Sequence, residues 1–144
     1  MMKRFLALPA AILLLTGFSF RSPAIHNVTI EAVDYAFRVP ATLPAGLTAF
    51  RLVNHGTVLH EVQIFRIVGI SYDSASKIIG KPPVGRPPFV SMSVLIVGPG
   101  QSTPDRVLED LHHGDIYGLV CQFQDADDKP HHRDMGMYAL VRVK

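Results

Sequence analysis

The chain has 144 residues, of which 48% are hydrophobic and 18% are charged, and it contains a single cysteine. One cysteine excludes an intramolecular disulfide, and this length is sufficient for one domain around one hydrophobic core. The formal net charge is +2 at pH 7. Lys and Arg do not cluster as they do in nucleic-acid-binding proteins, so we expect no nucleic-acid partner.

The beginning of the chain has the pattern of an export signal. Lys3 and Arg4 precede an apolar run, residues 5–20, and small residues follow at Ser22 to Ala24. Proline and glycine interrupt the run, which is shorter than the roughly 20 apolar residues of a membrane span. We predict a removable signal peptide over residues 1–24 and a mature domain over residues 25–144, located in the periplasm or outside the cell without stable membrane insertion. An uncleaved anchor is the alternative.

Short alternating apolar segments separated by Pro- and Gly-containing turns recur along the mature domain. This pattern predicts an all-β protein, an antiparallel sandwich or barrel, and seven strands fit a β-sandwich. The predicted strands cover residues 28–39, 46–54, 60–67, 91–97, 106–111, 115–121 and 137–143.

Residues 69–90 interrupt this rhythm. Ser71 and Asp73 are both suited to cap a short helix that extends to Ile79, and four prolines follow between residues 81 and 88. Proline has no N–H to donate to a neighbouring strand, so this stretch is not a central strand. We predict a short helical and Pro-rich excursion packed on one side of the sandwich.

Candidate metal ligands gather near the end of the chain. Cys121 is followed within sixteen residues by two histidines and two methionines, and His60 lies far upstream. A thiolate, two imidazoles and a weak axial thioether are the ligands of a mononuclear blue-copper site. Because side chains alternate between the two faces of a strand, His60 shares a face with Val62 and Ile64, and Cys121 shares one with Leu119. Both are predicted to point into the core.

The remaining ligands come from the segment after Cys121. His131 and His132 are adjacent, so only one of them is expected to reach the metal. The possible pairs are His132 with Met137, or His131 with Met135. We favour the first pair, because Met137 is in phase with the inward residues of the last strand and Gly136 permits a turn before it.

The spacings Asn54-x-Gly56-x3-His60 and Cys121-x10-His132-x4-Met137 resemble those of the cupredoxin family, which includes plastocyanin, azurin and the type 1 domain of copper nitrite reductases. The chain looks still closer to exported cupredoxin-like proteins with a Pro-His…Gly-Met ending. The resemblance implies a Greek-key β-sandwich that holds one copper ion, with His60, Cys121 and His132 as equatorial ligands and Met137 as the axial ligand. The interval from cysteine to histidine is longer than in the small electron carriers, and the loop within it is acidic.

Three functions compete at this point. The leading hypothesis is one-electron transfer to a redox partner, without enzymatic activity, because a sole type 1 copper offers no open position for a substrate. The second is Cu(I) trafficking or storage with a copper-transfer partner. The third is a copper-free sandwich that serves as an interaction module, with Cys121 as a core thiol. If copper binds, we expect Asn54 to hold the loop before His60 through a side-chain hydrogen bond.

Overall fold

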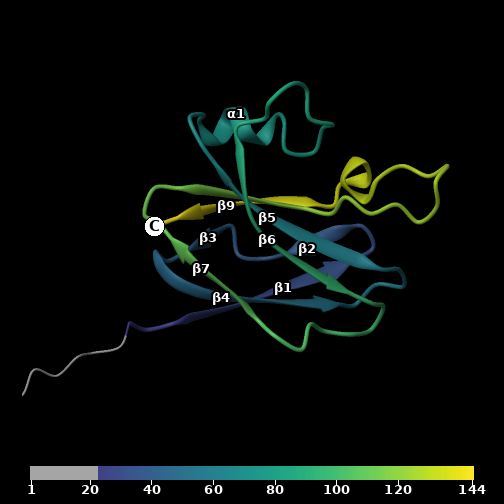
Figure 1. Ribbon diagram of the computed structural model, residues 1–144, viewed down its shortest axis with the longest axis horizontal. Helices are drawn as coiled ribbons and strands as arrows, with labels where there is room; N and C mark the ends of the chain where they lie inside the picture. The colour runs from purple at the N-terminus through teal and green to yellow at the C-terminus, as the bar shows by residue number, and fades with distance from the viewer. Residues whose placement is uncertain (1–22) are drawn as a thin grey trace, which may run out of the picture.

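Two β-sheets packed face to face form the body of the molecule in the computed structural model, which describes residues 23–144 (Figure 1). The four-stranded sheet has the order β2-β1-β4-β7, and the five-stranded sheet has the order β3-β9-β8-β5-β6. The strands are β1 (His26–Val33), β2 (Ala36–Arg38), β3 (Thr42–Leu43), β4 (Gly46–Asn54), β5 (His60–Ile67), β6 (Phe89–Val97), β7 (Val107–Leu111), β8 (Ile116–Val120) and β9 (Tyr138–Val143). The predicted signal peptide lies outside the described residues, except for Pro23 and Ala24.

The predicted β-sandwich is confirmed, but two details of its first third are wrong. Residues 28–39 do not form one strand: β1 and β2 are antiparallel neighbours, with Val33 opposite Ala36 across a turn at Asp34 and Tyr35. The short strand β3 lies in a segment predicted as a turn. The apolar residues occupy even positions up to Ala32 and odd positions from Val33 to Val39, so the alternation changes phase just before the chain reverses.

Both sheets are mixed, whereas the sequence predicted antiparallel pairing. β1 runs parallel to β4, and β3 runs parallel to β9. After β2 the chain crosses to the five-stranded sheet at β3 and returns at β4, so β4 lies beside β1 in the same direction. Alternation along a strand identifies its two faces but carries no information about the direction of its neighbour.

The main core lies between the two sheets. Buried side chains from both sheets meet there, including Ile30, Leu52, Val62, Leu119 and Val141. Cys121 and Met137 belong to the same cluster and are fully buried. The predicted inward phase of these two residues is therefore confirmed.

The excursion between β5 and β6 packs on the outer face of the five-stranded sheet, where Figure 1 shows it above β5 and β9. Helix α1 (Tyr72–Ser76) is capped by Ser71, whose hydroxyl accepts a hydrogen bond from the backbone N–H of Ser74 at 3.2 Å. The Ser71 cap is confirmed, although the helix ends three residues before Ile79. Ile79 packs close to Gly118 of β8, because a Cβ atom added at Gly118 would lie only 2.6 Å from Cδ1 of Ile79.

No helix among residues 23–144 combines the length and the apolar character needed to span a bilayer.

Candidate metal centre

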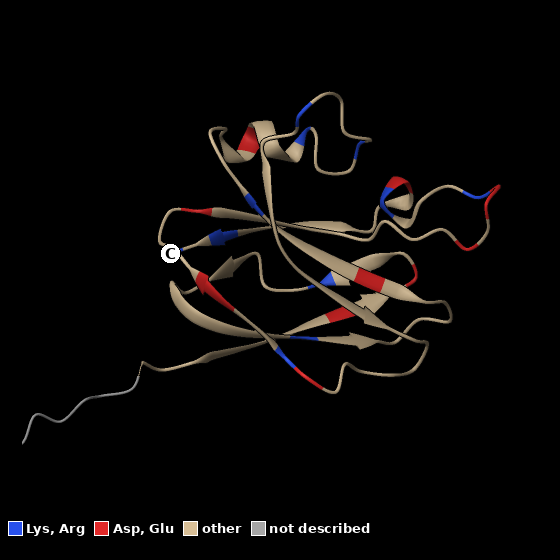
Figure 2. Cartoon of the chain, in the orientation of Figure 1, with Lys and Arg blue, Asp and Glu red and all other residues tan. Residues whose placement is uncertain are grey.

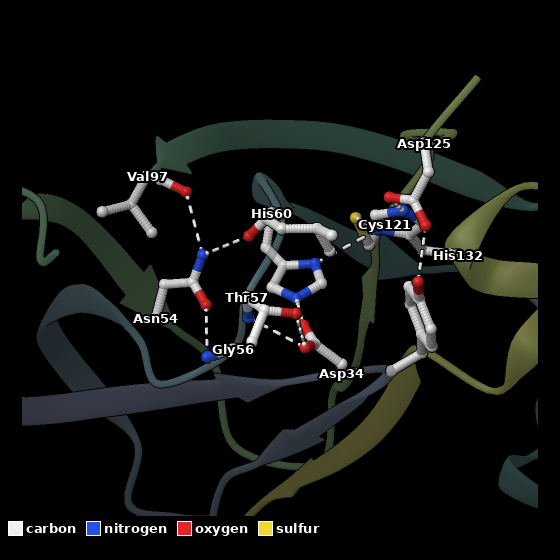
Figure 3. Close-up of polar contacts among 11 residues, drawn as sticks. Asp34, Asn54, Gly56, Thr57, His60, Val97, Cys121, Asp125 and His132 are labelled. Carbon is white, nitrogen blue, oxygen red and sulfur yellow. Dashed lines mark hydrogen bonds and ion pairs between the residues drawn. The ribbon is translucent and has the colours of Figure 1, made fainter. Parts of the chain in front are cut away.

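Three of the predicted ligands converge at one end of the sandwich (Figure 3). His60 is the first residue of β5, Cys121 directly follows β8, and His132 opens a short 3-10 helix (His132–Met135). All three residues are fully buried. One nitrogen or sulfur atom from each lies within 4.8 Å of those of the other two. The strand ends thus place an imidazole–thiol–imidazole cluster in the interior.

The same nitrogen atom of each imidazole faces the centre of the cluster. His60 Nδ1 lies 3.2 Å from His132 Nδ1. Cys121 Sγ lies 3.4 Å from that same His132 nitrogen. The two outer Nε2 atoms point away from the centre, toward separate acidic partners.

The fourth predicted ligand and its alternates occupy different environments. Met137 is fully buried, and its carbonyl accepts a hydrogen bond from the N–H of Cys121 at 3.1 Å. It follows Gly136, whose φ of 108° lies in the left-handed region that glycine adopts readily. Met135 is 37% exposed, and His131 bonds through Nδ1 to the carbonyl of Gln122 at 2.6 Å. This placement favours His132 and Met137 as the ligand pair, which stays a prediction.

Asp34, in the turn between β1 and β2, contacts the outer nitrogen of His60. Its Oδ1 lies 2.8 Å from His60 Nε2. Its Oδ2 accepts hydrogen bonds from the Thr57 backbone N–H at 2.8 Å and from the Thr57 hydroxyl at 2.7 Å. A Cβ atom on Gly56 would overlap Asp34 Oδ1 and come within 3.0 Å of His60 Nε2. The glycine of the Asn-x-Gly motif therefore leaves room for this carboxylate.

Asp125, in the loop between Cys121 and His132, makes the matching contact on the other imidazole. Its Oδ1 lies 2.9 Å from His132 Nε2, and its Oδ2 accepts a hydrogen bond from the Tyr35 hydroxyl. The Tyr35 ring packs edge-on against the His132 ring, with 4.8 Å between ring centroids. Figure 2 shows the acidic residues of this loop at the end of the molecule opposite the C-terminus.

The hydrogen bonds expected of Asn54 are present. Its side-chain amide donates to the carbonyl of Val58 at 2.7 Å and to that of Val97 at 3.2 Å, and its Oδ1 accepts from the N–H of Gly56 at 2.8 Å. One buried amide thus fixes the loop that leads into His60 and ties it to β6.

Burial and hydrogen bonding set the charges of the cluster. Desolvation raises the pKa of the Cys121 thiol and lowers the pKa of the His60 imidazole. Partial burial acts to raise the pKa of Asp34, but the hydrogen bonds that this carboxylate accepts outweigh it, so its pKa falls to about 2. The hydrogen bond between Tyr35 and Asp125 lowers the pKa of the carboxyl and raises that of the phenol. Both carboxyl groups are therefore ionised at neutral pH.

This arrangement fits a bound cation. A carboxylate only accepts hydrogen bonds, so the Nε2 atom that faces Asp34 or Asp125 carries the hydrogen of its ring. In a neutral imidazole the other nitrogen then presents a lone pair. Two such lone pairs face each other at 3.2 Å in a buried site, beside a sulfur. A metal ion at their meeting point would accept all three donors, and the combination of two His and one Cys suits copper.

Sequence reasoning missed Asp34, Tyr35 and Asp125. The first two lie inside the stretch predicted as one strand, just after the apolar alternation changes phase between Ala32 and Val33, which is the signal that could have located the turn. Asp125 belongs to an acidic loop that reads as solvated. The signal for Asp125 was the longer interval between cysteine and histidine, because added loop residues have to lie somewhere near the ligands they connect.

No protein-family model and no curated protein matches the sequence. Solved structures match the fold along most of the chain. Auracyanin B aligns with a TM-score of 0.52 and 18% identity over 90% of this chain and 95% of its own. The dithionite-reduced auracyanin of the photosynthetic bacterium Roseiflexus castenholzii aligns with 0.51 and 17%, over 86% and 99%. Auracyanin A of Chloroflexus aurantiacus, described as a "blue" copper protein, aligns with 0.51 and 16%, over 84% and 100%. The resemblance to the cupredoxins is thus confirmed at the level of structure, and this chain has the cupredoxin fold.

Proposed function

We propose that this chain is an exported electron carrier that binds one copper ion through His60, Cys121 and His132, with Met137 as a weak axial ligand. The observation that carries the proposal is the convergence of two Nδ1 lone pairs and one sulfur in a buried site. Bound copper would supply a one-electron Cu(II)/Cu(I) couple, and a weak axial thioether tunes its potential.

The surrounding residues suit electron transfer with little rearrangement. Asn54 fixes the loop before His60, and the outer nitrogen of each imidazole is held by a carboxylate. Outer partners of this kind set the orientation of a ligating histidine. Because the three donors are fully buried, the proposed partner is another redox protein, which would exchange electrons through the protein layer over the site. The proposed activity is not enzymatic.

Burial also distinguishes this proposal from Cu(I) trafficking. A carrier that passes its metal on needs ligands that a partner can reach. The soft ligands that could serve this purpose are divided: His132 and Met137 are buried, whereas Met135 is 37% exposed. Export is supported by the Lys3-Arg4 pair and the apolar run that follows it.

The test is copper loading of the purified protein, whose mass is expected to lack residues 1–24. We expect one copper per chain and an intense visible Cu(II)–thiolate band that disappears on reduction and returns on oxidation. Cys121→Ser should remove the band. His131→Ala is the matched control and should retain it, since His131 bonds to a backbone carbonyl outside the cluster. A colourless protein that binds Cu(I) tightly would favour trafficking, and a protein that binds neither ion would favour the copper-free module.

A further inference from the structure

Each imidazole of the metal centre has its own carboxylate, and each carboxylate is fixed at both oxygens. Asp34 contacts His60 through Oδ1 and accepts from Thr57 through Oδ2. Asp125 contacts His132 through Oδ1 and accepts from Tyr35 through Oδ2. The two arrangements come from different parts of the chain, the β1–β2 turn and the loop after Cys121, yet they have the same geometry.

Both carboxylates lie at the surface, directly over buried imidazoles, and are themselves partly buried. The side chain of Asp34 is 24% exposed and that of Asp125 is 31% exposed, while the imidazoles beneath them are 0% and 1% exposed. Partly buried charges are screened less by solvent and salt than exposed ones. The negative charge of each aspartate therefore acts on the ring that it contacts, and through the ring on whatever the inner nitrogen binds.

We propose that Asp34 and Asp125 are positioning residues that lower the reduction potential of the copper site. Each aspartate orients one imidazole through its Nε2–H and makes the ring a stronger electron donor, and outer partners of ligating histidines are known to tune affinity in this way. The oxidised ion carries one more positive charge than the reduced ion, so two fixed negative charges stabilise Cu(II) relative to Cu(I). This inference rests on the proposed copper site.

Replacing each aspartate with asparagine removes the negative charge but keeps groups that can form hydrogen bonds. Asp125→Asn is the cleaner variant: its amide oxygen can accept from His132, and its amide N–H can donate to the Tyr35 hydroxyl, which accepts as well as donates. Asp34→Asn keeps the contact to His60 but faces the N–H of Thr57 with an amide group. The control is Asp127→Asn in the same loop, whose side chain makes no hydrogen bond or ion pair with the residues that the structure describes.

The experiment is a redox titration of the copper-loaded protein and the three variants, followed through the visible Cu(II)–thiolate band. We expect each of Asp34→Asn and Asp125→Asn to shift the equilibrium at least tenfold toward Cu(I), a rise of about 59 mV for a one-electron couple. The double variant should shift further, and Asp127→Asn should match the wild type. Circular dichroism checks that each variant is folded, and Tyr35→Phe, which removes the hydrogen bond to Asp125 Oδ2 but keeps the negative charge, gives a second measurement and should not raise the potential as Asp125→Asn does.

The outcomes separate this inference from the proposed function. If the wild type shows no Cu(II)–thiolate band, the copper site itself is absent and both ideas fail. If the band is present but Asp34→Asn and Asp125→Asn leave the potential unchanged or lower it, the aspartates do not stabilise Cu(II) and only this inference fails. An equal rise in Asp127→Asn would also overturn it, because the effect would then follow net charge and not the contacts to the imidazoles.

Discussion

Asp34 shows how one residue couples the metal centre to the stability of the fold. Its carboxylate accepts from both donors of Thr57 and contacts His60, and its pKa falls from 3.8 to about 2 in the folded protein. In the unfolded chain the carboxyl group regains its ordinary pKa. Between these two values the unfolded state binds more protons than the folded state, so the free energy of unfolding rises with pH.

The prediction at this scale concerns acid unfolding of the copper-free protein. The stabilisation from Asp34 is expected to be complete above about pH 4 and to be lost as the pH falls toward about 2. Urea unfolding between about pH 5 and pH 2 should therefore give a steeper loss of stability for the wild type than for Asp34→Asn. Asp127→Asn should keep the steep profile of the wild type. Parallel profiles for the wild type and Asp34→Asn would show that Asp34 is not held as the structure indicates.

At the scale of elements, β8 is supported from both faces before it reaches Cys121. Tyr117 and Leu119 point into the core between the sheets, while Val120 contacts the outer cluster with Ile67, Ala75 and Ile79. The excursion between β5 and β6 thus covers the outer face of the strand that ends at the thiol. Gly118 allows the close approach of Ile79 to this strand.

Removing the Ile79 side chain should therefore destabilise the protein without altering the metal centre. Ile79 is 2% exposed, so Ile79→Ala leaves a cavity and should cost about 2–5 kcal/mol. Its neighbour Ile78 is 36% exposed, so Ile78→Ala removes less buried apolar surface and should cost only about 1 kcal/mol. Urea midpoints measure both effects, and copper-loaded Ile79→Ala should keep the visible spectrum of the wild type. Equal costs for the two variants would mean that the excursion does not pack on β8 as described.

At the scale of the whole molecule, the sequence predicted those features of the site that depend on local pattern. Alternation within the strands identified the inward phase of Cys121 and Met137, and spacing identified His60 and His132 as candidates. The contact between Asp34 and His60 joins the β1–β2 turn of one sheet to β5 of the other, across 26 positions of sequence. The packing of the two sheets decides which turn lies over which imidazole. The alternation of residues along a strand carries no information about that packing.

The candidate metal centre also links the two sheets, so we expect its occupancy to depend on the whole fold. His60 and Cys121 lie at the ends of strands in the five-stranded sheet. From the β1–β2 turn of the four-stranded sheet, Asp34 contacts His60 and Tyr35 contacts Asp125 in the loop after Cys121. Any separation of the sheets would break the contacts that orient the imidazoles. Copper bound in the folded state should therefore oppose unfolding of the entire domain.

Copper loading is accordingly expected to raise the free energy of unfolding by about 2.7 kcal/mol when free copper is at 100 times its dissociation constant, and by more at higher excess. The measurement is the urea midpoint of the wild type with and without copper, with Cys121→Ser as the control that should show no copper-dependent shift. A bound ion that leaves the wild-type midpoint unchanged would have equal affinity for the unfolded chain, and a preformed buried cluster could not then be its site. A shift confined to the wild type would instead mean that the donors brought together by β5, β8 and the short helix at His132 bind copper only when both sheets are in place.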